Sequence, residues 1–265
     1  MDSKKSFFYV NVVFFLISFF GSIFQSYFIY DPFHWGLAQS SLELFEGSKP
    51  YKDIFIHYGF FYTLTNSIIL KITNNDLIYI FFLSSLFYSL GNYYLCDLAY
   101  NKLKIRLAYF LPVILFLTHP FTNHPWYNYQ FYFLIVIILY FLINNNKYSL
   151  LFFSFFLSLS CLVYENFTVP AIVIIFFLLF ANRDLKNNIN LSMGFLLPQI
   201  LFHSYLSLFE LHEYWIKTFW LNEVFLKIYS TSFYDLMLNY INILIKKSIL
   251  DFISEPYYFL FFMIL

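Results

Sequence analysis

Residues 7–28 read FFYVNVVFFLISFFGSIFQSYF, a run of 22 residues without a charged side chain. An α-helix rises 1.5 Å per residue, so about 20 apolar residues cross roughly 30 Å of hydrocarbon. The run is too long for the apolar region of a signal peptide, and it ends at Tyr27 and Phe28 without a small-residue cleavage site. We therefore predict that this segment is a retained transmembrane helix.

The composition of the whole chain supports a membrane environment. Hydrophobic residues make up 61% of the sequence and charged residues only 11%, whereas soluble domains carry roughly 25% charged residues. The formal net charge is zero, so no electrostatic attraction favours nucleic acid, and we expect no nucleic-acid partner. Cys96 and Cys161 lack CxxC spacing and are expected to be free thiols packed as small hydrophobes. Abundant Phe, Ile, Asn and Lys are typical of an AT-rich bacterial genome, so we expect the bacterial plasma (inner) membrane.

Further charge-poor runs follow the first one, divided by polar stretches. They lie at about 77–95, 106–118, 131–143, 148–163, 168–181 and 189–209. We therefore predict an all-α, polytopic integral membrane protein with one transmembrane domain over residues 1–265. The apolar run Tyr257–Leu265 stops after nine residues, and we expect the chain to be truncated there.

The basic residues of the short loops predict the orientation. If the N-terminus is cytoplasmic, successive crossings place Lys102, Lys104, Arg106, Lys147, Arg183 and Lys186 on the same side. The loops 119–130 and 164–167, on the opposite side, contain no lysine or arginine. We therefore expect a multi-pass protein with a cytoplasmic N-terminus and an outer side formed by the other set of loops.

This topology requires that Gly59–Ile72 does not cross the membrane. Its 14 residues would form a helix about 21 Å long, which is shorter than the hydrocarbon layer. Trp35–Glu46 alternates apolar and polar residues loosely, as expected of an interfacial helix. Residues 31–76 are thus predicted to form the first extracytoplasmic loop, with two juxtamembrane helices.

Asp31 is the candidate catalytic residue because it follows the first predicted span directly and precedes Pro32. A carboxylate at that depth is partly desolvated, which raises its basicity, and it can remove the proton of an acceptor hydroxyl. The alternative is a helix-end carboxylate solvated at the interface. Acidic residues have little influence on topology, so their concentration on the outer side needs another reason, such as a site.

The segment after Asp31 carries a family resemblance. The turn Gly47-Ser48-Lys49-Pro50-Tyr51-Lys52-Asp53 and the segment His57-Tyr58-Gly59 resemble the first outer loop of GT-C membrane glycosyltransferases. This superfamily includes lipid A aminoarabinose transferases and protein O-mannosyltransferases. The resemblance implies that Asp31 activates the acceptor. It also implies a polyprenyl-phosphate sugar donor and a lipid, glycan or protein acceptor as partners, besides membrane lipids.

A lipid-phosphate leaving group needs cations or hydrogen-bond donors where its charge develops. Lys49, Lys52 and His57 are the nearest candidates, although the two lysines are equally explained as a solvated hairpin or a headgroup contact. The other residues predicted to bind donor phosphate or substrate are Asp53, Tyr58, His124 and Glu165. We predict no metal ligands and no cofactor, because the spacing of His119 and His124 is a weak metal signal.

Two other functions fit the same sequence. One is a transporter or flippase of lipid-linked sugars, which would place polar residues near the middle of the membrane on broken helices. The other is an oligosaccharide polymerase or ligase that uses the same kind of donor. Because the ionisable residues gather at the outer edge, the sequence favours chemistry at the membrane surface.

Overall fold

The structure is a computed structural model that describes residues 3–26, 32–54, 56, 59–74, 76–119, 121, 126–143, 148–182 and 184–220. Over these residues the chain is all-helical, and the one extended pairing among them is an isolated bridge between Pro50 and Ile54. The helices in chain order are α1 (Ser3–Ser26), α2 (Pro32–Phe45), α3 (Phe60–Ile72), α4 (Ile78–Asp97), η1 (Leu98–Lys102), η2 (Arg106–Phe110), α5 (Leu111–Thr118), α6 (Tyr127–Ile143), α7 (Ser149–Val163), η3 (Glu165–Phe167), α8 (Thr168–Ala181), α9 (Leu185–Leu208), α10 (His212–Trp215) and η4 (Ile216–Trp220).

The predicted apolar runs coincide with these helices. The runs at 77–95, 131–143, 148–163, 168–181 and 189–209 correspond to α4, α6, α7, α8 and α9, with ends that differ by a few residues. The run at 106–118 divides into the 3₁₀ helix η2 and the α-helix α5. Pro112 lies in the first turn of α5, where its missing N–H costs no helical hydrogen bond, so the new helix begins there.

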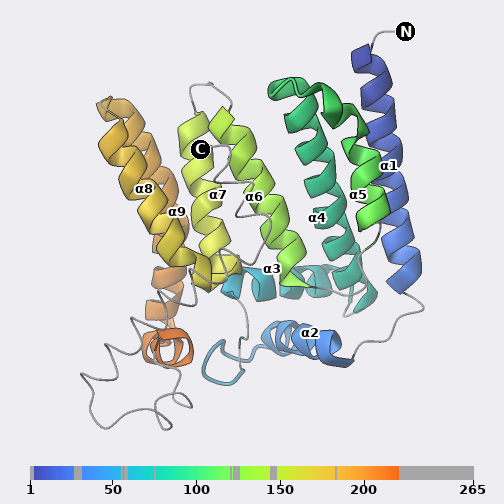
Figure 1. The fold of residues 1–265 in the computed structure, drawn as a ribbon. Coiled ribbons are helices and arrows are strands. Elements are labelled where there is room, and N and C mark those ends of the chain that lie inside the picture. The colour runs from blue at the N-terminus through green and yellow to red at the C-terminus, as the bar shows by residue number, and fades with distance from the viewer. Residues whose placement is uncertain are drawn as a thin grey trace, which may run out of the picture.

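The long helices pack side by side in the order α1, α4, α6, α7, α9 (Figure 1). Helix α6 lies in the middle, and Phe131, Leu134, Ile135 and Ile138 on several of its faces are buried. A helix that is apolar all round is either buried in a protein core or spans a membrane. Neighbouring helices cover α6 here, whereas α8, which is also apolar, leaves large side chains exposed.

The chain alternates between two ends of this bundle (Figure 1). At one end, which we call the basic end, lie the start of α1, η1 and η2, and the start of α9; its described basic residues are Lys4, Lys5, Lys102, Lys104, Arg106 and Lys186. At the other, which we call the cap end, lie α2, α3, η3 and α10. The same residues were predicted to lie on one side of a membrane, and in the structure they lie at one end of the helix bundle.

Helices α2 and α3 lie across the cap end, roughly perpendicular to the long helices, and pack on each other (Figure 1). Helix α3 has 13 residues and is about 20 Å long, and it lies across the ends of its neighbours. Helix α3 thus differs in direction from the long helices, and that Gly59–Ile72 stays outside a membrane remains a prediction.

Two helices of the described chain are long and apolar enough to cross a membrane, by length and composition. They are the 22-residue Lys4–Gln25 segment of α1 and the 24-residue α9. The apolar helices α3, α6 and α7, and the combined segments Arg106–Thr118 and Glu165–Ala181, are shorter. Large apolar side chains lie on the surface, including Phe177 and Phe180 of α8 with exposed fractions of 70% and 86%.

Candidate functional site

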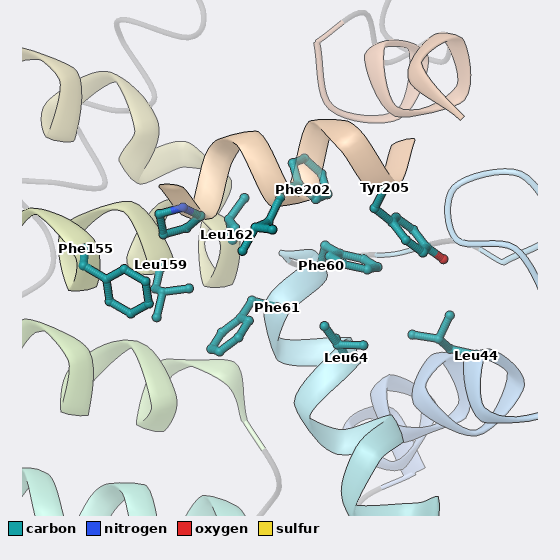
Figure 2. Close-up of a pocket in the computed structure, with 11 residues that line it drawn as sticks. Leu44, Phe60, Phe61, Leu64, Phe155, Leu159, Leu162, Phe202 and Tyr205 are labelled. Carbon is teal, nitrogen blue, oxygen red and sulfur yellow. The ribbon is translucent and has the colours of Figure 1, made fainter. Parts of the chain in front are cut away.

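An apolar pocket lies at the cap end, between α3, α7 and α9. Its volume is about 420 Å³, within the roughly 300–1,000 Å³ typical of ligand pockets. Figure 2 shows its walls, which are Leu44 of α2, Phe60, Phe61 and Leu64 of α3, Phe155, Leu159 and Leu162 of α7, and Pro198, Leu201, Phe202 and Tyr205 of α9. The Tyr205 hydroxyl is the one polar side-chain group among these residues, so the pocket suits a hydrocarbon chain.

The pocket wall continues to the surface of the molecule. Leu201 lines the pocket and yet has an exposed fraction of 63%, and it belongs to the same face of α9 as the exposed Leu197 and Leu208. A chain of apolar groups therefore leads from the outside of α9 into the pocket. Such an arrangement is suited to a ligand that arrives from an apolar environment.

Beside the pocket, a buried polar contact joins distant parts of the chain. The Tyr51 hydroxyl donates a hydrogen bond of 3.3 Å to Oε1 of Glu165, across 114 positions of sequence. Tyr51 is buried together with Phe60, Leu162 and Phe202, which also form pocket wall, and its ring centroid lies 6.4 Å from that of Phe60. The Tyr51–Glu165 contact and the pocket therefore share one apolar cluster.

The loop that carries Tyr51 is closed by its own backbone and by Asp53. The Asp53 carboxylate accepts a hydrogen bond of 2.9 Å from the Lys49 N–H, and the Asp53 N–H donates one of 2.9 Å to the Lys49 carbonyl. This tight turn holds Tyr51 at a φ of 65°, in the left-handed region that bulky residues rarely adopt. The turn thereby directs the Tyr51 side chain into the protein, while Lys52 stays exposed.

A glycine fixes the other end of the same loop. The Gly59 N–H donates a hydrogen bond of 3.0 Å to the carbonyl of Val163, at the end of α7. A Cβ atom on Gly59 would lie 2.1 Å from the carbonyl oxygen of Leu162, so only glycine permits this approach. We name residues 48–59 the docking loop; it contacts the α7–η3 corner at both Tyr51 and Gly59.

Burial controls the protonation of Glu165. The residue keeps some accessible surface, but its Oε2 atom is buried and has no hydrogen-bond partner among the described residues. Burial raises the pKa of the Glu165 carboxyl well above its ordinary value, and the Tyr51 hydroxyl and the Trp215 indole lower it only in part. Burial also raises the pKa of Tyr51, and the neighbouring Glu165 adds to this. Burial therefore favours the uncharged form of both groups.

Aromatic residues of α9 and α10 complete the surroundings. His203 Nδ1 lies 3.3 Å from His212 Nε2, and the two rings stack with an interplanar angle of 5°. Trp215 packs against His203 and Phe202, with centroid distances of 5.1 and 5.7 Å. This imidazole pair was not predicted from the sequence, although His203 and His212 stand as polar residues on either side of the helix end at Leu208.

Four of the residues predicted from the sequence lie outside the described residues: Asp31, His57, Tyr58 and His124.

Lys49, Lys52 and Asp53 share the docking loop with Tyr51, and Glu165 contacts that loop directly. The Lys52 ammonium lies 5.6 Å from the ring centroid of Tyr214, a cation–π distance, so this lysine is placed beside α10. Asp53 is engaged in closing its turn.

No cluster of three or more His, Cys, Asp or Glu side chains suited to a metal ion occurs within the part of the chain that the structure describes. The predicted outer loop 119–130 contains His119 and His124, of which the structure describes His119. Its Nδ1 lies 3.0 Å from the Tyr88 hydroxyl. This contact belongs to an aromatic cluster with Tyr129 and Tyr132.

Comparison with known protein families, with curated proteins and with solved structures finds no match to this chain.

Proposed function

We propose that this protein is a polytopic membrane glycosyltransferase that moves a sugar from a polyprenyl-phosphate donor to an acceptor on the extracytoplasmic face. The observation that carries this proposal is the apolar pocket of about 420 Å³ that shares its walls with the Tyr51–Glu165 contact. A lipid-linked sugar has the same two parts, a long hydrocarbon chain and a polar head. The polyprenyl chain binds between α3, α7 and α9, and the phosphosugar lies towards the docking loop.

The membrane assignment draws on the outside of the bundle. Soluble monomers rarely expose apolar patches larger than a few hundred Å², whereas the outer faces of α1, α8 and α9 are apolar along their length. The basic end faces the cytoplasm and the cap end the opposite side, following the bias of lysine and arginine in short loops. Cysteine labelling tests this orientation: Lys104→Cys reacts with an impermeant maleimide only after the membrane is opened. Labelling in intact cells would overturn the proposal.

The reaction assigns one role to each part of the site. The Asp31 carboxylate takes the proton of the acceptor hydroxyl while that oxygen bonds to the anomeric carbon. The bond between the anomeric carbon and the phosphate oxygen breaks, and the phosphate leaves with the electron pair, so the anomeric configuration inverts. Lys49 and Lys52, both exposed on the docking loop, stabilise the leaving phosphate. Asp31 immediately precedes α2, which packs on α3 of the pocket wall.

The test separates chemistry from donor binding. With a radiolabelled polyprenyl-phosphate sugar and isolated membranes, Asp31→Asn is expected to abolish transfer of label to acceptor while expression and insertion stay unchanged. Leu159→Trp fills the pocket and is expected to prevent cross-linking of a diazirine-bearing polyprenyl phosphate to α7 and α9. The matched control is Leu185→Trp, an exposed leucine at the start of α9 on the basic end, which leaves cross-linking intact. Full transfer by the Asp31→Asn variant would refute the proposal.

A further inference from the structure

Three segments that are distant in sequence meet at the Glu165 carboxyl. The docking loop reaches it through the Tyr51 hydroxyl, 3.3 Å from Oε1, and the α7–α8 corner carries it. The α9–α10 corner supplies Trp215, whose indole is one of the groups that act on Glu165. Each of these segments also contributes to the apolar cluster beside the pocket, so the carboxyl lies at a junction of the cap end.

The junction is built for an uncharged carboxyl group. The Oε2 atom is buried without a partner among the described residues, and a charged oxygen in that position would lose its hydration with little compensation. Within the described chain, the side chains acting on the protonation of Glu165 are Tyr51 and Trp215, neither of which is a cation. The other titratable groups nearby, on the elements packed around it, are Cys161, Tyr205, His203 and His212.

We propose that Glu165 is a positioning residue: as a neutral acid it holds Tyr51, and thereby fixes the docking loop with Lys49 and Lys52 at the mouth of the apolar pocket. This inference rests on the proposed function for its consequence, since the position of the lysines matters where a lipid phosphate binds. Its physical part does not depend on any reaction. Whenever the loop leaves the corner, Glu165 enters water and ionises at its ordinary pKa.

Ionisation of the opened state makes the docking dependent on pH. Between the ordinary pKa of a glutamate and the raised pKa of buried Glu165, opening releases one proton. The population of the opened loop therefore rises about tenfold per pH unit in that window and is constant above it. Glu165→Gln keeps an acceptor for Tyr51 and has no proton to release, so its opening is independent of pH.

Limited trypsin digestion of the detergent-solubilised protein measures the opening. Cleavage after Lys52 reports the docking loop, because the Lys49–Pro50 bond resists trypsin. The ratio of the cleavage rates of the wild-type protein and Glu165→Gln, taken at each pH, cancels the pH dependence of trypsin itself. We expect this ratio to rise with pH above the ordinary pKa of a glutamate, by up to about tenfold per unit, until the pH reaches the raised pKa of buried Glu165. Glu213→Gln is the matched control, and its ratio to wild type should stay within about twofold because Glu213 is solvent-exposed. A wild-type to Glu165→Gln ratio that does not change with pH overturns the proposal.

Donor kinetics give the second readout. Glu165→Ala is expected to lower kcat/KM for the polyprenyl-phosphate sugar at least fivefold, and Glu165→Gln to restore it, because the loop positions the lysines that stabilise the leaving phosphate. Equal kcat/KM values in all three proteins would contradict the positioning role. If the cleavage ratio behaves as expected but the wild-type protein transfers no sugar, the proposed function fails and the docking of the loop by Glu165 stands.

Discussion

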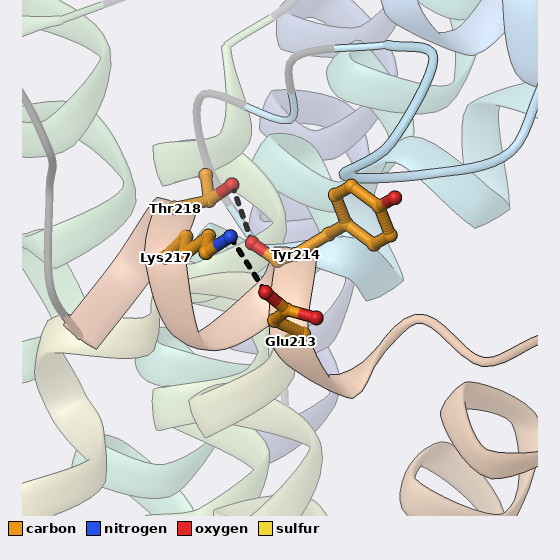
Figure 3. A network of polar contacts seen from close by, with 4 residues as sticks. All are labelled: Glu213, Tyr214, Lys217 and Thr218. Atoms are coloured by element: carbon orange, nitrogen blue, oxygen red, sulfur yellow. Dashed lines mark hydrogen bonds and ion pairs between the residues drawn. The ribbon is translucent and has the colours of Figure 1, made fainter.

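Glu165 and Glu213 both lie at the cap end, yet their surroundings are opposite. Glu165 has a buried carboxyl oxygen and hydrogen-bonds to Tyr51, and burial raises its pKa. Glu213 is 73% exposed, its Oε1 lies 2.6 Å from the Lys217 ammonium, and the hydrogen bond and charge of Lys217 lower its pKa (Figure 3). The first joins segments 114 positions apart, and the second joins neighbours four positions apart on one short helical segment.

The difference shows which polar contacts determine the shape of the site. An exposed ion pair gains little, because water already stabilises both charges. A buried hydrogen bond has a modest net value too, but removal of one partner leaves the other without solvent. The docking loop therefore depends on Tyr51, Glu165 and Gly59, whereas α10 and η4 do not depend on the Glu213–Lys217 pair.

The largest effect is expected where the docking loop touches the end of α7. In Gly59→Ala the new methyl group would lie 2.1 Å from the Leu162 carbonyl oxygen, so the backbone must move and the hydrogen bond to Val163 is lost. We expect a loss of about 3 kcal/mol, at the upper end of overpacking costs, measured by thermal or denaturant unfolding in detergent. Gly47→Ala is the control: φ is 98° there but no atom lies within 4 Å, so backbone strain alone costs about 1 kcal/mol. Equal losses in the two variants would contradict the close packing at Gly59.

The second prediction concerns the pH dependence of stability. The pKa of Glu165 is raised in the folded protein. Its contribution to the free energy of unfolding is therefore fully present below the ordinary pKa of glutamate and is lost as pH rises through the folded pKa. The slope in that window is about 1.4 kcal/mol per pH unit. Glu213, whose pKa is lowered, acts in the opposite direction: its contribution is present above the ordinary pKa and is lost as pH falls.

Unfolding curves recorded between pH 5 and 9 check this sign. In Glu165→Gln the free energy of unfolding should decline less with rising pH than in the wild-type protein. In Glu213→Gln it should decline as it does in the wild-type protein. The interpretation would be wrong if the wild-type protein and Glu165→Gln lost stability in parallel as pH rises.

The sequence was sufficient for the helices and insufficient for the junction between them. Each apolar run between polar stretches predicted a helix, because a long apolar segment can satisfy its backbone groups only internally. The segment Gly59–Ile72 was set apart by its length, and α3 indeed lies across the other helices. Local spacing and composition carry this information.

The site depends on contacts that no local pattern encodes. Tyr51 and Glu165 are 114 positions apart, and nothing in either segment indicates the other. The pocket residues Leu159 and Leu162 are apolar like the exposed Phe152 of the same helix, so composition cannot separate pocket residues from surface residues. The Asp53 carboxylate accepts a hydrogen bond from the Lys49 N–H, and its predicted contact with substrate stays a prediction. An aspartate four positions after Lys49 in a Pro-containing turn could have suggested that turn-closing role.

A smaller effect is expected from Tyr51→Phe. The variant keeps the ring in the apolar cluster but removes the donor to Glu165 Oε1, which costs about 1 kcal/mol in unfolding experiments. The Tyr51 hydroxyl also lowers the pKa of Glu165, so without it that pKa moves further up and the pH-dependent decline extends to more alkaline pH. A variant with wild-type stability and an unchanged pH profile would show that the hydroxyl is not coupled to Glu165.

The smallest effect is expected at the exposed ion pair. Lys217→Ala removes the 2.6 Å contact with Glu213, but both side chains are substantially exposed, at 42% and 73%, so water replaces the lost partner. Unfolding experiments should show a change within about 0.5 kcal/mol, which shrinks further in high salt because exposed pairs are screened. Cleavage after Lys52 should keep its wild-type pH dependence, since the docking loop is held by Glu165 and not by Glu213. A Lys217→Ala variant as unstable as Gly59→Ala would mean that α10 and η4 fix the cap end, and the distinction between the two carboxylates would then be lost.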